Sequence, residues 1–300
     1  MSVRREKSLQ ATNNPVLTVV VVTHNSSNVI ERCLSSLGKE DWFECVVVDC
    51  GSTDSTLAQV SGFDYVRVVE THNVGYGRGN NLGVTAANTD LVLILNPDVL
   101  IDSNRLWALV SYFQTEGRNM MLSCKMFQTN GDGSRNYRRD SRFTGVVNQE
   151  KRLCGALMLM SKDDFTALGG FDEKIFLYFE EVDLCRRAYE QGLRILIYGE
   201  VQVEHLRAAS TPDSLEYAVL RGWHDGWSKA YYICKCVNSR SIATSKISKT
   251  VLQSSIKFVI AVVRGDKDTA HREAWKVRGM LAFLRGEAAF DSDDMPRYLP

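Results

Sequence analysis

Short apolar runs alternate with amphipathic stretches through the first third of the chain. Four of these runs are rich in β-branched residues and predict strands at 17–22, 44–49, 65–69 and 91–96. Their continuous apolar character is typical of strands that are buried on both faces of a parallel sheet. Helical spacing between them predicts helices at 29–37, 55–60 and 80–87. The alternation favours βαβ units, and hence an α/β fold with a doubly wound sheet.

The later pattern is less regular and then becomes helical. It predicts a helix at 103–115, a strand at 154–160, a helix at 181–191 and a strand at 194–197. Further helices are expected at 215–237, 245–264 and 269–284. We therefore expect a disordered N-terminal segment at 1–15, an α/β domain at 16–212 and a helical C-terminal region at 213–300.

Charge and cysteine usage narrow the class of protein. Basic and acidic residues both number 36, so the net charge gives no indication of a nucleic-acid partner. Residues 235–285 nevertheless hold 11 basic residues against 3 acidic ones, a net charge of +8. Eight cysteines without paired spacing predict free thiols in a reducing cytoplasm. The polar first residues lack the apolar core of a signal peptide, and no uncharged apolar run reaches the ~18 residues of a membrane span.

Polar side chains follow each of the four predicted strands. They are His24 and Asn25, Asp49, Asn73, and residues 96–98. Because ligands bind at the carboxyl ends of strands in doubly wound sheets, we expect these side chains to share one site.

The segment 49–56 ends one strand and opens the next helix. The carboxylate of Asp49 is suited to accept hydrogen bonds from a nucleobase or a ribose hydroxyl. Asp54 or Ser55 equally suits a cap of the following helix.

A segment rich in glycine and asparagine, 73–83, also leads into a helix. Its glycines permit close backbone approach, and free N–H groups at the start of a helix bind anions. Taken alone, the segment nearly fits a dinucleotide fingerprint, but Asn80 replaces the third glycine. Arg78 is long enough to reach a phosphate.

Two acidic clusters carry the candidate chemistry. In the segment 96–98 a carboxylate can hold Mg²⁺ or Mn²⁺, which neutralises a departing pyrophosphate, although Asn-Pro-Asp also suits a plain turn. Glu180, Glu181 and Asp183 open a helix, where acidic residues interact well with the helix dipole in any case. A carboxylate there can also take a proton from an attacking hydroxyl.

In their order and spacing, these segments resemble family 2 glycosyltransferases of the GT-A fold, in the rhamnosyltransferase-like subgroup. The patterns are D-x-G-S-x-D at 49–54, N-x-G-x-x-x-G-N-N-x-G at 73–83, D-x-D at 96–98 and E-D-x-D-L-x-x-R at 180–187. The resemblance implies a GT-A-type, Rossmann-like, doubly wound mixed sheet with a C-terminal helical extension. Residues 16–100 would be its nucleotide-sugar half and 101–212 its acceptor half.

The resemblance also implies residue roles. Glu181 corresponds to the general base, with Glu in place of the usual Asp, and Asp183 joins it in the catalytic set, mainly by supporting the shape of the site. Asp98 and His205 correspond to the residues that bind Mg²⁺ or Mn²⁺, although a lone His is otherwise usually structural. The residues expected to bind the nucleotide sugar are Thr23, Asn25, Asp49, Asn73, Gly75, Arg78, Asn81, Asn96 and Asp98.

Acceptor binding is expected on the other side of the site. A basic cluster within the acceptor half is suited to grip the diphosphate of a lipid-linked acceptor, and a solvated loop is the alternative. The resemblance adds a glycine and an acidic residue. The expected acceptor or diphosphate residues are Arg138, Arg139, Arg142, Gly155 and Glu180.

The C-terminal helices combine apolar spacing with Lys and Arg. A basic amphipathic helix suits an anionic membrane surface. Packing onto the catalytic domain, or onto a second subunit in a homodimer, is an equal alternative.

The resemblance implies an inverting, metal-dependent glycosyltransferase. From its cysteines we expect it in the cytoplasm, and it would be peripheral at the inner face of the plasma membrane if the basic C-terminal helices bind there. It would move a sugar, rhamnose being expected, from a dTDP- or UDP-sugar to a glycan or polyprenyl-diphosphate-linked acceptor of bacterial surface polysaccharide. A nucleotidyltransferase would share the sheet, but residues 23–26 lack its Gly-rich basic loop. A non-catalytic binding or assembly subunit stays open, because Asn96 and Glu181 depart from the commonest pattern.

Overall fold

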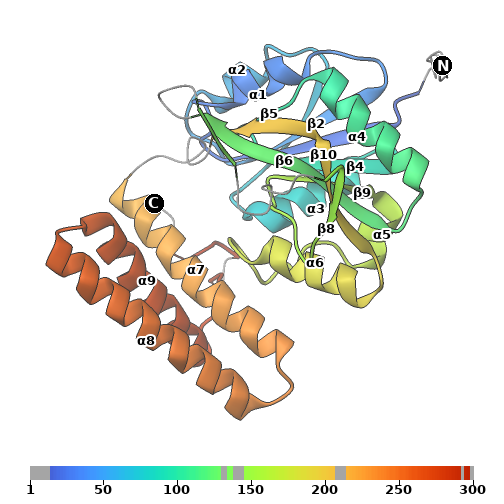
Figure 1. Ribbon diagram of the computed structural model, residues 1–300. Helices are drawn as coiled ribbons and strands as arrows, with labels where there is room; N and C mark the ends of the chain where they lie inside the picture. Colours follow the sequence, from blue (N-terminus) through green and yellow to red (C-terminus); the bar gives the residue numbers. More distant parts are fainter. Residues whose placement is uncertain (1–13, 130–133, 138–144, 207–213, 292–293, 298–300) are drawn as a thin grey trace.

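The four strands predicted in the first third of the chain lie side by side at one end of a mixed sheet of ten strands (Figure 1). The computed structural model describes residues 14–129, 134–137, 145–206, 214–291 and 294–297. In spatial order the strands are β3 (Val66–Thr71), β2 (Phe43–Cys50), β1 (Leu17–Thr23), β4 (Leu91–Leu95), β9 (Leu157–Ser161), β6 (Met120–Thr129), β10 (Arg194–His205) and β5 (Val99–Leu100). Two short strands, β7 (Arg135–Tyr137) and β8 (Val147–Gln149), pair with β6 and β10.

Strand direction changes between β4 and β9. The strands β3, β2, β1 and β4 are all parallel, and the register places Thr23 opposite Asp49. β9 runs antiparallel to β4 and to β6, and β10 is parallel to β6. The four parallel strands therefore deliver their carboxyl ends to one edge, next to the point where the direction switches.

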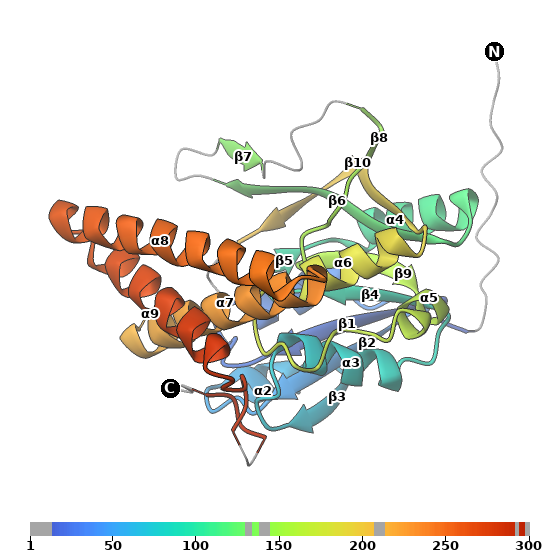
Figure 2. The ribbon, with the colours of Figure 1, turned by 90° about the horizontal axis from the view of Figure 1, so that it is seen from below.

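Helices cover both faces of the sheet (Figure 2). α1 (Ile30–Leu37) and α4 (Ser103–Glu116) pack their apolar stripes into one core cluster. α3 (Tyr76–Ala86), α5 (Lys162–Ala167) and α6 (Glu180–Glu190) pack into the cluster on the opposite face. The short α2 (Thr56–Val60) follows β2.

Glycine allows α3 to lie very close to the sheet. A Cβ atom on Gly83 would approach Val20 Cγ1 to 2.2 Å, and one on Gly79 would approach Val22 Cγ1 to 2.8 Å. Two of the glycines in the Gly/Asn-rich segment thus serve helix–sheet packing.

Three long helices follow the sheet and form a bundle beside it (Figure 1). They are α7 (Leu215–Cys236), α8 (Arg240–Arg264) and α9 (Lys267–Leu284). Phe176 packs with Trp223, Trp227 and Phe290 in a shared apolar cluster, which joins the bundle to the α/β body. In the part of the chain that is described, no helix is long and apolar enough to cross a membrane.

The expected α/β sheet with a C-terminal helical extension is confirmed. Strand β6 was not predicted, because Ser123 and Lys125 interrupt its apolar run. α3 begins four residues earlier than expected, at Tyr76, directly after Gly75. The predicted disorder of 1–15 falls almost wholly outside the described residues. The three-part division of the chain stays a prediction.

Candidate active site

A pocket lies at the carboxyl ends of β1 and β4, beside the loops that follow β2 and β3. Its volume is about 250 Å³, and four residues expected to bind the nucleotide sugar line it: Thr23, Asn73, Gly75 and Asn96. Aromatic side chains complete one wall: Tyr76, Phe176, Tyr178 and Tyr217. We call this the donor pocket. A larger cavity of about 670 Å³ lies at the opposite, amino-terminal edge, next to Val16 and Leu91, where doubly wound sheets do not usually bind ligands.

Asp49 is buried behind the donor pocket and orders its loops. Its side chain accepts hydrogen bonds from Thr23 Oγ1 at 3.0 Å, Ser52 N at 2.9 Å and Ser52 Oγ at 2.6 Å. Asp54 accepts one from Thr56 N, the first residue of α2, at 3.0 Å, whereas the N-cap residue Ser55 makes no side-chain cap hydrogen bond. The predicted contact between Asp49 and the nucleotide stays a prediction.

Asn25 joins this loop to the C-terminal bundle. Its backbone is left-handed, with φ of 51°. The side-chain oxygen accepts a hydrogen bond from Thr53 N at 2.8 Å, and the side-chain nitrogen donates to the Tyr217 hydroxyl at 3.1 Å. Asn25, two residues after the end of β1, therefore holds both the loop after β2 and the start of α7.

Gly75 is required where the loop after β3 meets the loop before α6. Its φ is +86°, and a Cβ atom there would lie 2.4 Å from Phe176 O. Tyr76 N donates to the same carbonyl oxygen at 3.2 Å, and Gly75 N donates to Asn73 Oδ1 at 3.3 Å. These contacts close one side of the donor pocket.

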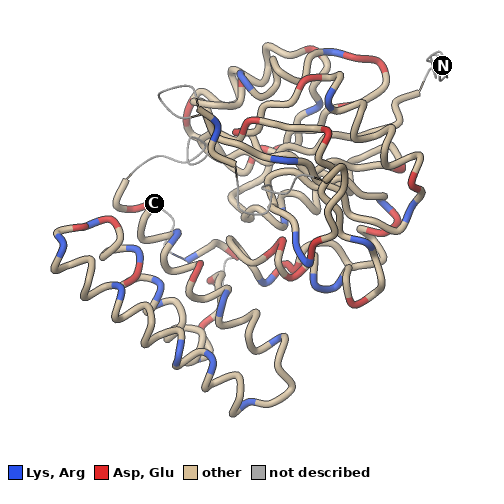
Figure 3. Tube along the Cα trace, viewed as in Figure 1, with Lys and Arg blue, Asp and Glu red and all other residues tan. Residues whose placement is uncertain are grey.

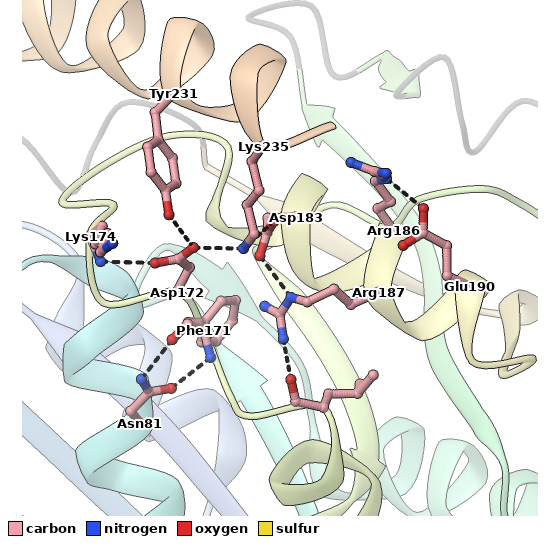
Figure 4. Close-up of polar contacts among 11 residues, drawn as sticks. Asn81, Phe171, Asp172, Lys174, Asp183, Arg186, Arg187, Glu190, Tyr231 and Lys235 are labelled. Atoms are coloured by element: carbon pink, nitrogen blue, oxygen red, sulfur yellow. Dashed lines mark hydrogen bonds and ion pairs between the residues drawn. The ribbon is translucent and has the colours of Figure 1, made fainter. Parts of the chain in front are cut away.

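Arg78 and Asn81 are engaged with other parts of the chain. The Arg78 guanidinium donates to both carboxylate oxygens of Asp294, at 2.9 and 2.8 Å, and lies 3.9 Å from the centroid of the Phe290 ring. The Asn81 amide donates to Phe171 O at 3.0 Å and accepts from Phe171 N at 2.9 Å (Figure 4). Their predicted contacts with a nucleotide sugar are not tested by this geometry.

Asp98 and His205, far apart in sequence, lie together. Asp98 Oδ1 is 3.2 Å from His205 Nε2, and both side chains are almost completely buried. Strand β10 brings His205 opposite Val99 of β5. Three buried polar atoms here have no hydrogen-bond partner: Asn96 Oδ1, Asp98 Oδ1 and His205 Nδ1. Because buried polar atoms are nearly always paired, these atoms indicate a place for a ligand.

The donor set fits a hard divalent cation. Oxygen ligands suit Mg²⁺ and Mn²⁺, and imidazole is also acceptable to transition metals. Within the described ranges, no group of three or more His, Cys, Asp or Glu residues could hold a metal. A cation bound by Asp98 and His205 would therefore keep positions for water and for substrate phosphate, as Mg²⁺ usually does.

The turn before α6 is strained. Tyr178 and Phe179 have φ of 66° and 71°, and left-handed backbone costs a non-glycine residue about 1–3 kcal/mol. Such strain clusters at functional sites. Glu180, which follows, is buried, and its Oε2 has no hydrogen-bond partner. Burial raises the pKa of Glu180 well above its usual value, and Glu181 raises it further.

Glu181 lies next to the turn that leads into β9. A Cβ atom on Gly155 would be 3.3 Å from Glu181 Cβ, and the Tyr76 hydroxyl donates to Gly155 O at 2.6 Å. The next residue, Ala156, accepts a hydrogen bond from Asn96 N at 2.9 Å. Gly155 and Ala156, the two residues before β9, thus link Glu181 to the segment 96–98 that holds the other acidic cluster.

Asp183 is held in an ion-pair network between α6 and α7 (Figure 4). Its oxygens lie 2.7 Å from Lys235 Nζ and 2.8 Å from Arg187 Nε. Lys235 also contacts Asp172 at 2.6 Å, and the Tyr231 hydroxyl donates to Asp172 at 2.8 Å. This arrangement fits the supporting role expected for Asp183 within the catalytic set.

Sequence reasoning missed the contribution of α7. Tyr217, Leu220 and Arg221 line the donor pocket, and Lys235 pairs with Asp183. Helical spacing alone assigned these residues to a separate region. The predicted acceptor residues Arg138, Arg139 and Arg142 lie outside the described residues.

Comparison with known proteins defines first the class and then the family. The fold is that of GT-A glycosyltransferases. The mannosyltransferase PcManGT from Pyrobaculum calidifontis, solved with GDP-Man and Mn²⁺, has a TM-score of 0.55 at 15% identity, covering 91% of this chain and 88% of that one. Residues 1–349 of Staphylococcus aureus TarS, solved with UDP-GlcNAc, have a TM-score of 0.55 at 18% identity, covering 91% of this chain and 92% of that one.

Residues 18–176 match the family described as glycosyl transferase family 2, and the chain belongs to that family. It is therefore a glycosyltransferase. The alternative interpretation, a nucleotidyltransferase, is wrong. An N-acetylglucosaminyl-diphospho-decaprenol L-rhamnosyltransferase of Mycobacterium tuberculosis is 27% identical over 302 residues, covering 83% of this chain and 98% of the relative. Rhamnosyltransferase WbbL of Escherichia coli is 23% identical over 210 residues, covering 59% and 78%.

Proposed function

We propose that this protein is an inverting, metal-dependent rhamnosyltransferase. It transfers rhamnose from a dTDP- or UDP-sugar to a polyprenyl-diphosphate-linked glycan acceptor, in the synthesis of bacterial surface polysaccharide. The proposal is supported by the Asp98–His205 pair, which leaves buried polar atoms without partners close to Asn96 of the donor pocket. It is also supported by Gly155 and Ala156, of which the first lies next to Glu181 and the second accepts a hydrogen bond from Asn96. The relatives named above, two of which are rhamnosyltransferases, support the choice of sugar and acceptor.

The donor pocket would take the nucleoside of the donor. Its aromatic wall suits a base, and the polar ends of β1 and β4 suit ribose and diphosphate. Asp49 accepts a hydrogen bond from Thr23, which lines the pocket, and another from Ser52, so it would orient these hydroxyls or exchange one of its hydrogen bonds for the base. Arg221, which lines the pocket from α7, would add a positive charge for the diphosphate.

Asp98 and His205 would hold Mg²⁺ or Mn²⁺. When bound, the cation neutralises the charge of the departing nucleoside diphosphate. Asn96 supplies a neutral oxygen next to it, where a second Asp would add a charge.

Glu181 would act as the general base. It accepts the proton of the acceptor hydroxyl as that oxygen bonds to the anomeric carbon, and the bond to the diphosphate breaks with its electron pair leaving on the phosphate oxygen. One displacement inverts the configuration. Burial and the neighbouring Glu181 raise the pKa of Glu180 well above its usual value, so Glu180 would hold its proton more readily than an exposed Glu and is the less suited of the two to act as the base.

Replacing the base tests the proposal. Glu181→Gln should lower the transfer rate about 100- to 10,000-fold, the usual contribution of a general base. Binding of the donor should persist, since Gln keeps the shape of Glu. The measurements are transfer from dTDP-rhamnose with Mn²⁺, and thermal stabilisation by dTDP- and UDP-sugars. Glu190→Gln, an exposed residue of the same helix, is the matched control. Undiminished turnover in Glu181→Gln would remove Glu181 as the base.

A further inference from the structure

The helix α8 exposes an apolar stripe to solvent. Five aliphatic residues at positions i, i+4, i+7, i+8 and i+11 lie on one side of the helix. They are Leu252, Ile256, Val259, Ile260 and Val263, with exposed fractions of 61%, 52%, 57%, 45% and 81%. The opposite side packs on the bundle through Ala243, Ile247, Thr250, Ser254 and Ala261. A contiguous exposed patch of this kind marks an interaction surface.

The charges of α8 are all positive (Figure 3). The helix carries Arg240, Lys246, Lys249, Lys257 and Arg264, and no Asp or Glu. Lys246, Lys257 and Arg264 are spaced at i, i+11 and i+18, so they follow one border of the stripe. Basic residues beside an apolar face are typical of helices that lie in the plane of an anionic membrane.

The same charges disfavour a second copy of the chain as the partner. A two-fold interface through α8 would bring two such helices together, and neither contains an acidic residue to offset the other's cations. Anionic lipid headgroups supply the missing charge. We propose that α8 lies flat on an anionic membrane surface, with its stripe in the boundary between headgroups and acyl chains.

The position of α8 connects this surface to the active site. The helix leads directly into α9, whose first turns line a cavity of about 560 Å³. Its charged lining residues are Arg221, Asp225, Lys267, Asp268 and Arg272. Arg221 and Tyr178 also line the donor pocket. Docking through α8 would thus bring the cavity at the start of α9, which adjoins the donor pocket at Tyr178 and Arg221, close to the membrane. Binding of α8 to the membrane does not depend on the proposed function. Only its purpose, to bring the site close to a lipid-linked acceptor, rests on that function.

Vesicle flotation of the full-length protein tests the surface. Wild type should float with vesicles of phosphatidylglycerol and phosphatidylcholine, and much less with phosphatidylcholine alone. Val259→Ser with Val263→Ser should weaken vesicle binding at least about tenfold, because two exposed apolar side chains no longer enter the bilayer boundary. Lys246→Ser with Lys257→Ser should remove the preference for anionic lipid. Val68→Ser with Tyr189→Ser, exposed apolar positions elsewhere, is the matched control.

Two further measurements separate the possible outcomes. Light scattering reports the oligomeric state, and a dimer that the Val259→Ser, Val263→Ser variant dissociates, without vesicle binding by wild type, would overturn the proposal in favour of a second copy. Transfer to a short-chain, water-soluble acceptor should be the same in this variant and in wild type. If neither protein transfers sugar but wild type still floats, the proposed function fails and the membrane surface stands.

Discussion

The candidate site has one buried carboxylate on its β1–β2 side, Asp49, and one on its β4–β10 side, Asp98. The two differ in how fully they are hydrogen-bonded. Asp49 accepts three hydrogen bonds from within its own loops. Asp98 Oδ1 has only the 3.2 Å contact with His205, which lacks hydrogen-bond geometry, and Asn96 Oδ1 beside it has no partner. The first carboxylate therefore stabilises the fold of a binding loop. The second is left with capacity for a ligand, which is what a reacting centre requires.

The largest effect expected from this contrast is on activity at the second carboxylate. Asp98→Asn should lower transfer by more than about tenfold and abolish the thermal stabilisation by Mn²⁺, since it removes the only anionic ligand of the proposed cation. The unfolding free energy without metal should hardly change. Asp49→Ala should instead lower the unfolding free energy by about 1–3 kcal/mol, because Thr23 and Ser52 lose a buried acceptor. Urea denaturation measures both variants. Equal losses of stability would contradict the contrast.

A second effect concerns the link between α6 and the bundle. Lys235→Met leaves Asp183 and Asp172 without their shared cation. Because Lys235 is partly exposed, we expect a loss of about 1–3 kcal/mol, in the range for hydrogen bonds to charged groups. Lys235→Met combined with Asp183→Asn should lose less than the sum of the single variants. Lys229→Met, on the same helix, controls for the loss of a lysine. Additive losses would show that the pair does not couple.

A smaller effect is expected in the pH dependence of stability. The pKa of Glu180 is raised in the folded protein by burial and by Glu181, so the unfolded chain loses this proton at a lower pH than the folded one. The contribution of Glu180 is fully present below its unfolded value near 4.5 and is lost as pH rises toward the folded pKa. Unfolding free energies from pH 4 to 8 should therefore fall more steeply in wild type than in Glu180→Gln. Parallel curves would contradict burial of an ionisable Glu180.

Local pattern sufficed for much of the fold because buried strands and amphipathic helices leave a periodic signal. The four parallel strands and the three C-terminal helices lie close to their predicted ranges. β6 was missed because its polar residues break that signal. The motif residues Thr23, Asn73, Gly75 and Asn96 share one pocket, since parallel strands bring their carboxyl ends to one edge.

By itself, the amino-acid sequence determined the sheet, the helical extension and the family, since periodicity and short motifs are local properties of the chain. Only the tertiary structure decided the partners of long side chains. It paired His205 with Asp98, engaged Arg78 with Asp294, and placed Tyr217 and Arg221 of α7 in the donor pocket. Such contacts join residues up to 216 positions apart, and they depend on packing between elements, which no local pattern records.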